Sequence, residues 1–141
     1  SFSKTNNLNI MFAKLKIKIE GTKIFIGGKS LGARVAVQLA STGYKVNGVV
    51  CLGYPFHPPG KPEKLNLETV VRLGVPALFL QGTRDTFANI KYVKPVLEKV
   101  DHFSLVEVSG GNHSFIVKDQ QTVDVYDFLS SNIESFIISQ M

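Results

Sequence analysis

Three polar side chains of the types that cooperate in nucleophilic catalysis follow separate turns of the sequence. Ser30 lies in a Gly-Lys-Ser-Leu-Gly turn, Asp85 follows a Gln-Gly-Thr-Arg turn, and His113 follows a Gly-Gly-Asn turn. A serine hydroxyl is a poor nucleophile until a base accepts its proton, and imidazole suits this task because its unperturbed pKa lies near neutral pH. A carboxylate then holds the imidazole in one tautomer and offsets its developing positive charge. We therefore predict Ser30 as nucleophile, His113 as base and Asp85 as acid.

The setting of Ser30 supports this interpretation. An apolar run precedes it and a helix-like stretch follows, which predicts a sharp strand-to-helix turn that lifts the hydroxyl above the sheet edge. The five-residue pattern alone is a weak indication, because three fixed small residues recur by chance. The acid and the base also follow predicted strands, however, and parallel strands bring their carboxyl ends to one edge of the sheet.

Each of the three residues also has a structural alternative. Ser30 can act as a helix-start hydroxyl that caps the following helix. Asp85 can be a turn or cap residue, because Gly-x-x-Asp is common turn chemistry. His113 can be an incidental loop residue. The strand-turn-helix setting and the flexible glycines before the histidine favour the catalytic interpretation.

Three further residues are candidates for lining a substrate pocket. Lys29 lies inside the turn, where a solvent-facing side chain is favoured over contact with an anionic substrate, because no phosphate-cradling loop surrounds it. Tyr54 and His57 lie in a Pro-rich loop, where a structural role for His57 is at least as well supported. His102 follows a predicted helix and is expected at the surface. The spacing of the histidines and the single cysteine, Cys51, do not indicate a metal site.

The elements that must position these residues follow from the alternation of short apolar runs with longer amphipathic ones. This alternation predicts βα units around a parallel sheet flanked by helices, an α/β fold. Strands are expected at residues 23–27, 48–52, 76–81 and 103–108, since each run is brief and apolar. Helices are expected at residues 33–42, 90–100 and 122–138, with a short helix near 67–73.

The amino-terminal residues fit two patterns. Residues 14–19 alternate lysine with apolar side chains, as in a strand, whereas Met11, Leu15 and Ile19 share one face of a helix. Parallel strands are joined by crossover helices, so we favour a helix that precedes the strand at 23–27 and ends near Gly21.

Length and composition bound the class of protein. The 141 residues are 44% hydrophobic, enough for one domain, residues 1–141, with its own core. No leader and no apolar run of membrane-spanning length is recognised, and Cys51 is expected to be buried, so we expect a cytoplasmic protein. The net charge of +5 suggests nucleic-acid binding as one function to consider, but the basic residues cluster weakly and no binding motif is present. A solvated basic face is favoured, and no nucleic-acid or membrane partner is expected.

Four segments together resemble a known family. Residues 27–34, 51–65, 81–85 and 113–115 look like the predicted α/β-hydrolases of the KANL/TEX type, relatives of dienelactone hydrolase. The run Tyr-Pro-Phe-His-Pro-Pro-Gly-Lys-Pro-Glu-Lys is more specific than the serine turn, and the order serine, aspartate, histidine is that of the α/β-hydrolases.

The resemblance implies a serine hydrolase that acts on carboxylic-ester-type bonds through an acyl-enzyme, with a small-molecule ester as substrate and no cofactor. It assigns the nucleophile to Ser30, the acid to Asp85 and the base to His113. It also implies that the backbone N–H of Leu31 supplies one half of the oxyanion hole.

The chain departs from the family at its amino end. Relatives carry a further segment with the first strands of the sheet and a His-Gly loop that donates to the oxyanion, whereas 29 residues precede Ser30 here and none resembles that loop. We therefore expect the carboxyl-terminal part of a hydrolase domain, lacking its first strands. Its strand 23–27 would be an edge that is paired by a second copy, paired by a separate amino-terminal chain, or left unpaired in an aggregation-prone fragment. Light scattering after size-exclusion chromatography tests this. The alternative function is a non-catalytic scaffold, or an inactive fragment, that mediates protein association.

Overall fold

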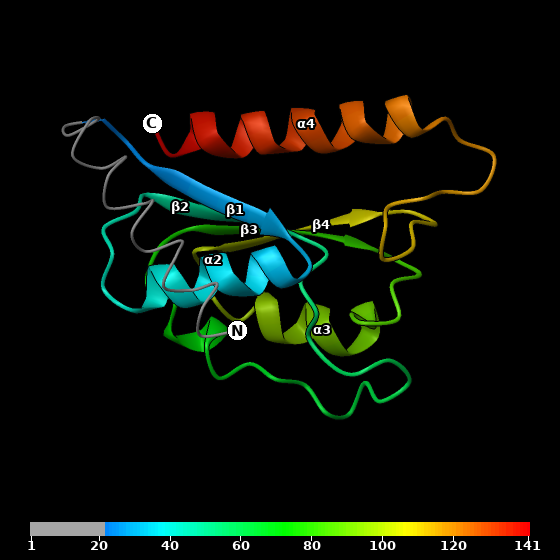
Figure 1. The fold of residues 1–141 in the computed structure, drawn as a ribbon, viewed down its shortest axis with the longest axis horizontal. Helices are drawn as coiled ribbons and strands as arrows, with labels where there is room; N and C mark the ends of the chain where they lie inside the picture. The colour runs from blue at the N-terminus through cyan, green and yellow to red at the C-terminus, as the bar shows by residue number, and fades with distance from the viewer. Residues whose placement is uncertain (1–21) are drawn as a thin grey trace.

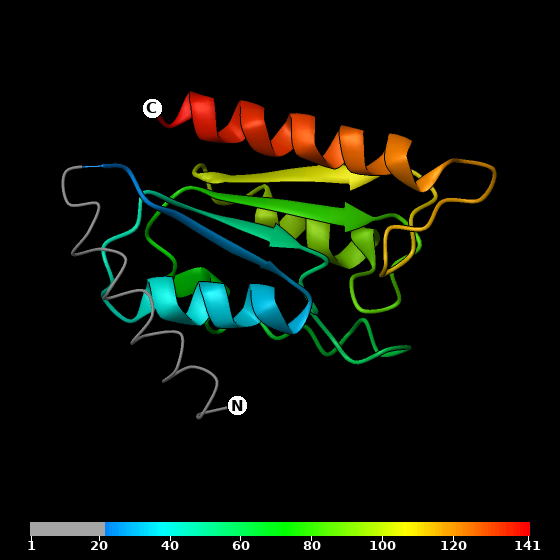
Figure 2. The same cartoon turned by 45° about the horizontal axis from the view of Figure 1, so that its top comes forward.

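A computed structural model describes residues 22–141, and the helix expected to end near Gly21 lies outside them. The described residues contain one four-stranded parallel sheet, as predicted (Figure 1; Figure 2). In the order in which they neighbour one another, its strands are β1 (Phe25–Lys29), β2 (Gly48–Leu52), β3 (Ala77–Gly82) and β4 (Phe103–Val108). All carboxyl ends therefore point to the same edge, where residues from different strands can meet.

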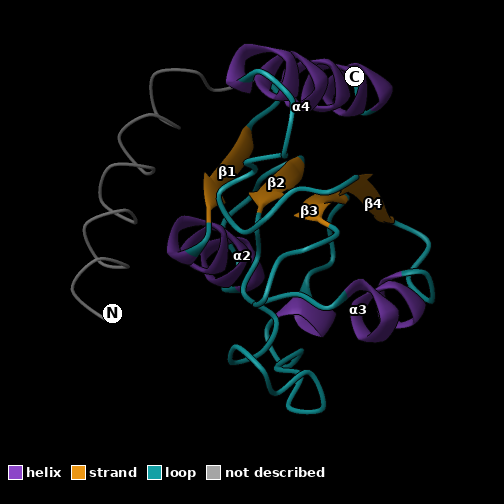
Figure 3. Ribbon diagram, turned by 90° about the vertical axis from the view of Figure 1, so that its right-hand side faces the viewer, coloured by secondary structure: helices purple, strands orange, loops and turns teal. Residues whose placement is uncertain are grey.

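Helices cover both faces of the sheet (Figure 3). On one face lie α2 (Leu31–Ser41), α3 (Ile90–Leu97) and the short 3₁₀ turn η1 (Val70–Arg72); on the other lies α4 (Thr122–Ser139). Among the described residues, no helix combines the length and the apolar character needed to cross a bilayer.

Alternate residues of the central strands supply two separate cores, which explains why β2 and most of β3 are continuously apolar. Phe79 of β3 packs in the core on the side of α2 and α3, whereas its neighbours Leu78 and Leu80 pack in the core beneath α4. Cys51 of β2 is fully buried in the first core, as predicted, and burial raises the pKa of its thiol.

Several element boundaries differ from the prediction. β1 begins at Phe25 rather than at residue 23 and extends two residues further than expected, because Gly28 and Lys29 belong to the strand rather than to the turn. A Cβ atom at Gly28 would lie 2.4 Å from the carbonyl carbon of Gly32, so the absence of a side chain lets α2 start close to the strand. α3 ends at Leu97 rather than at residue 100, and its continuation forms tighter i to i+3 turns.

In the sheet formed by residues 22–141, β1 is one of the two outer strands. Within the described part of the chain, β1 pairs with β2 alone. That another strand covers this edge stays a prediction.

Candidate active site

Ser30 is the single residue that joins β1 to α2. Its φ of 53° is uncommon for a residue other than glycine, and its N–H donates to the Leu52 carbonyl of the neighbouring strand at 2.8 Å. The Ser30 carbonyl accepts from the N–H of Ala33, whereas its side chain makes no capping hydrogen bond with the helix. The backbone, rather than the hydroxyl, thus starts α2, and the Ser30 side chain is left available to another partner.

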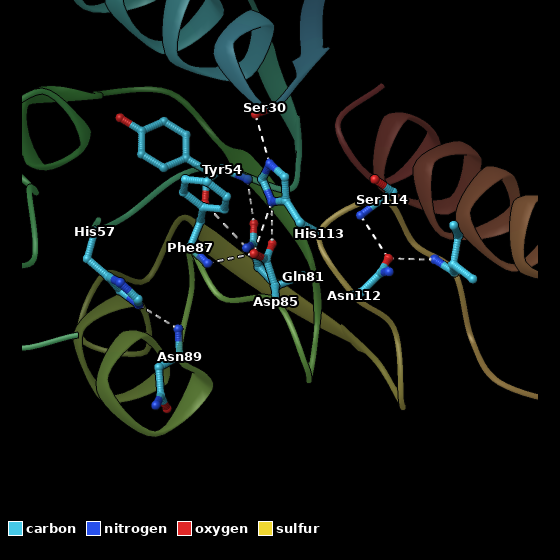
Figure 4. Close-up of polar contacts among 11 residues, drawn as sticks. Ser30, Tyr54, His57, Gln81, Asp85, Phe87, Asn89, Asn112, His113 and Ser114 are labelled. Atoms are coloured by element: carbon cyan, nitrogen blue, oxygen red, sulfur yellow. Dashed lines mark hydrogen bonds and ion pairs between the residues drawn. The ribbon is translucent and has the colours of Figure 1, made fainter. Parts of the chain in front are cut away.

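That partner is His113, in the loop after β4 (Figure 4). The Ser30 Oγ lies 2.9 Å from the His113 Nε2, and the His113 Nδ1 lies 2.9 and 3.0 Å from the two carboxylate oxygens of Asp85. A carboxylate only accepts hydrogen bonds, so the Nδ1 carries the proton and the Nε2 accepts from the serine hydroxyl. The structure therefore brings the three predicted residues into one hydrogen-bonded line.

The Asp85 carboxylate is held in position by a hydrogen bond from its own loop. The Phe87 N–H donates to the Asp85 Oδ1 at 2.8 Å, and the Phe87 ring lies against the imidazole of His113 with centroids 4.5 Å apart. The side chain of Asp85 is fully buried, whereas that of His113 is 23% exposed. Asp85 thus also has the turn role proposed as its structural alternative, because the same oxygen that faces the imidazole closes the turn.

The loop carrying His113 is fixed by contacts of Asn112 and Gly111 that the sequence did not reveal. The Asn112 Oδ1 accepts from the N–H groups of Ser114 and Ile116, at 2.9 and 3.0 Å. A Cβ atom at Gly82 would lie 2.2 Å from the Gly111 carbonyl oxygen, so the two loops touch through bare backbone. An asparagine one residue before the predicted base is a turn signal that could have identified the first contact.

Leu31 follows the serine as the first residue of α2. The first N–H groups of a helix have no acceptor within it, and no described residue accepts from the Leu31 N–H. This donor is open beside Ser30, at a helix end that favours negative charge.

Of the three pocket candidates, Lys29 reaches an open space. It lines a cavity of about 340 Å³ between the ends of β1 and β2, the loop after His113 and α4. The cavity is mostly apolar, and its further lining residues are Leu52, Ser114, Phe115, Tyr126, Leu129, Ser130 and Ile133.

Tyr54 corrects the expectation for its loop. Its side chain is 4% exposed and packs in the core against Phe56 and Phe79, with ring centroids 4.6 and 6.0 Å away. Burial, followed by the nearby Cys51 thiol, raises the pKa of Tyr54 to about 12. The Pro-rich loop folds its aromatic side chains inward because they complete the core, so Tyr54 is not placed to line an open pocket.

His57 is also buried, with 5% of its surface exposed, and both its ring nitrogens have partners. Its Nδ1 lies 2.8 Å from the Pro58 carbonyl oxygen, and the Asn89 N–H donates to its Nε2 at 2.8 Å. It borders a second cavity, of about 310 Å³, behind Asp85. His102 is exposed, as predicted, and bonds to the Leu73 carbonyl. Within residues 22–141 no group of three or more His, Cys, Asp or Glu side chains is arranged to hold a metal ion.

The Gln81 amide is a further contact that the sequence analysis missed. It is fully buried, and its Oε1 accepts from the Tyr54 N–H at 2.8 Å while its Nε2 donates to the Tyr54 carbonyl. Gly53, which precedes Tyr54 in the chain and has a φ of 64°, lies beneath the His113 ring. A glutamine that ends an otherwise apolar strand was the available signal.

Solved structures of several hydrolases are similar to this chain. An esterase from Pyrococcus furiosus aligns with a TM-score of 0.74 at 16% identity, over 96% of this chain and 60% of that one. A monoacylglycerol lipase from Paleococcus ferrophilus gives 0.68 at 17%, over 98% and 75%. An alpha-beta serine hydrolase homologue from Coxiella burnetii gives 0.63 at 20%, over 77% and 50%. The chain thus spans half to three quarters of their lengths, and the likeness at these identities shows the fold.

The family model described as "Alpha/beta hydrolase domain" matches residues 3–138, nearly the whole sequence. The parallel sheet, the serine between β1 and α2, and the order of serine, aspartate and histidine agree with this match. The chain therefore belongs to the α/β-hydrolase family.

Proposed function

We propose that this chain carries the nucleophile, base and acid of a serine hydrolase that cleaves carboxylic esters. The observation that carries the proposal is the continuous line from the buried Asp85 carboxylate through His113 to the Ser30 hydroxyl, with contacts of 2.9 Å at each step. Such a line is what activates a serine hydroxyl at neutral pH.

The reaction has two halves. Ser30 Oγ attacks the ester carbonyl carbon while its proton moves to the His113 Nε2; the C–O bond to the alcohol then breaks, and the alcohol leaves with that proton. Water attacks the resulting acyl-enzyme, gives one proton to His113, and releases the acid while the proton returns to the Ser30 oxygen. Asp85 stabilises the imidazolium in both halves and stays ionised.

The negative oxygen that forms in each half needs donors near it. Among the described residues, we assign this task to the Leu31 N–H, which has no other acceptor and lies at the start of α2. The donor is part of the backbone, so its position depends on the turn at Ser30 rather than on a side chain.

The cavity beside Lys29 supports an apolar acyl group as the part of the substrate bound by this chain. Its volume of about 340 Å³ lies within the usual range for small-ligand sites, and Leu52, Phe115 and Ile133 contribute apolar surface. Its lining includes Lys29 and Ser114, the chain neighbours of Ser30 and His113, although Ser30 and His113 themselves do not line it.

The Pro-rich segment supports a finer placement within the family. Residues 54–64 resemble the KANL/TEX type, and we propose that the chain is a dienelactone-hydrolase-related enzyme of that type. A cytoplasmic location is part of the proposal, supported by the buried, unpaired Cys51.

Covalent labelling tests the chemistry directly. A fluorophosphonate probe should attach to Ser30, with the site identified by mass spectrometry of the labelled peptide, and Ser30→Ala should abolish labelling. Circular dichroism shows whether both forms are folded. A wild-type protein that is folded but not labelled would support the scaffold alternative instead.

A panel of p-nitrophenyl esters then tests the bond type and the acyl preference. We expect turnover that depends on Ser30 and falls once the acyl chain exceeds the capacity of the cavity. Labelling of Ser30 without turnover of any ester would keep the nucleophile and overturn the proposed substrate class.

A further inference from the structure

We propose that His57 is a positioning residue, which fixes the loop bearing Asp85 and through it the orientation of His113. For its kinetic readout the proposal rests on the proposed function, whereas its spectroscopic readout does not. The buried imidazole of His57 bonds through its Nδ1 to Pro58 within the Pro-rich loop and through its Nε2 to Asn89 after β3, so the ring ties one loop to the other.

The hydrogen bonds of His57 determine its tautomer. The Asn89 N–H can only donate, so the His57 Nε2 is an acceptor, and the Nδ1 must carry the proton that it donates to the Pro58 carbonyl. Both nitrogens are thereby engaged, at 2.8 Å each, and the side chain is 5% exposed. The ring is thus unavailable to a substrate but suited to holding two segments together.

The same pair of loops meets a second time through the backbone. The N–H groups of Phe56 and His57 both donate to the Phe87 carbonyl, at 2.9 and 3.2 Å. The segment from Asp85 to Asn89 is therefore attached to the Pro-rich loop at two of its residues, Phe87 and Asn89. Figure 4 shows the bond between His57 and Asn89.

This segment is the one that aligns the acid with the base. Phe87 donates its N–H to the Asp85 Oδ1 and places its ring against His113. A shift of the segment would move the carboxylate and the ring packing at once. Misplacement by about 1 Å can cost about 100-fold in rate, so loss of the His57 bond is expected to act on turnover rather than on substrate binding.

Two near-isosteric variants separate the two bonds of His57. In His57→Gln the amide oxygen can reach the position of the Nε2 and accept from Asn89, whereas in His57→Asn the amide can replace only the Nδ1 and its bond to Pro58. We expect kcat to fall about tenfold or more in H57N with KM changed less than about twofold, and H57Q to retain kcat within about threefold. If H57N does not fold, His57→Leu is used in its place, because leucine also cannot accept a hydrogen bond from Asn89.

His102 provides the matched control. It too bonds to a backbone carbonyl, that of Leu73, but from the end of the sheet opposite the site. His102→Asn should leave kcat within about twofold of wild type. Equal losses in H57Q and H57N, or no loss in either, would overturn the positioning role even where wild-type turnover confirms the hydrolase.

A spectroscopic measurement tests the role of His57 even if the protein turns over no ester. The His113 Nδ1 proton, which faces Asp85, should give a downfield proton NMR signal that disappears in Asp85→Asn. H57Q should retain this signal, and H57N should shift it upfield or broaden it. An unchanged signal in H57N would overturn the proposal, whereas absent labelling and turnover of the wild type would count against the proposed function alone.

Discussion

Asp85 is the residue whose surroundings are most completely determined in the site. Its carboxylate is fully buried, faces the Nδ1 of His113, and accepts a second bond from the Phe87 N–H. A buried carboxylate needs such partners, because an unpaired one would be costly to desolvate. The negative charge is thus available to the imidazole without competition from bulk solvent.

Replacing Asp85 by asparagine tests that charge. The amide has the same shape, but it cannot stabilise an imidazolium and can favour the other tautomer of His113. We expect kcat/KM for a p-nitrophenyl ester to fall by about 10³- to 10⁴-fold while the protein stays folded. The exposed Asp101→Asn is the control for losing one acidic charge, and a loss of less than tenfold in D85N would argue against the assigned acid.

At the scale of elements, the serine turn depends on the contact between β1 and α2. The Cβ that Gly28 lacks would meet the backbone of Gly32 and Ala33 within 3 Å, whereas a Cβ on Gly32 would meet no atom within 4 Å. The two outer glycines of the same five-residue motif therefore have different physical roles.

Matched alanine variants separate these roles. Gly28→Ala must push α2 away from the strand, and we expect it to lower the free energy of unfolding by about 1–3 kcal/mol and to reduce Ser30 labelling. Gly32→Ala should leave stability unchanged or raise it by about 0.5 kcal/mol, since alanine favours a helix. Urea titration measures both, and equal destabilisation by the two variants would contradict the different roles assigned to these glycines.

The helix α4 forms one wall of the cavity beside Lys29, and two adjacent serines on it allow a paired test. Ser130 lines the cavity, whereas Ser131 is exposed and is not part of its lining. We expect Ser130→Phe to shift the p-nitrophenyl ester preference toward shorter acyl chains, mainly by raising KM for the longer ones. Ser131→Phe should leave the preference as in wild type; the same shift in both variants would place the acyl group elsewhere.

At the scale of the whole molecule, two cores flank one sheet, and the larger of them contains the ionisable Cys51 and Tyr54. Burial raises the pKa of both side chains, that of Tyr54 to about 12. A raised pKa means that the folded state favours the neutral form, so these groups stabilise the fold below their unfolded pKa values.

Alkaline unfolding follows from this burial. The phenol of Tyr54 has an ordinary pKa of 10.0, so its contribution is complete below about pH 10 and is lost as the pH rises toward 12. Tyr54→Phe should flatten the fall in the free energy of unfolding over that interval, measured by urea titration at several pH values. Tyr92→Phe, at an exposed site, is the control and should keep the wild-type slope.

Different parts of the molecule were predictable to different degrees. The strands at 48–52 and 103–108 match their predicted bounds, because short continuous apolar runs between turns are typical of buried parallel strands. The start of α2 was misplaced because residues 28–32 were interpreted as a turn, whereas Gly28 and Lys29 continue β1 and Leu31 already begins α2. Tyr54 and His57 were candidates for lining a pocket, with a structural role left open for His57. The sequence could not decide between these roles, because the direction of each side chain depends on the path of the whole loop.

Apolar periodicity and turn residues act over short distances, so they are enough to predict the alternation of strands and helices and the edge of the sheet at which Ser30, Asp85 and His113 lie. Only the packing of distant segments places His113 2.9 Å from both Ser30 and Asp85, buries Asp85, and lets His57 accept a bond from the Asn89 N–H. These contacts join residues 28 to 83 positions apart, and the packing of loops against the two cores sets them.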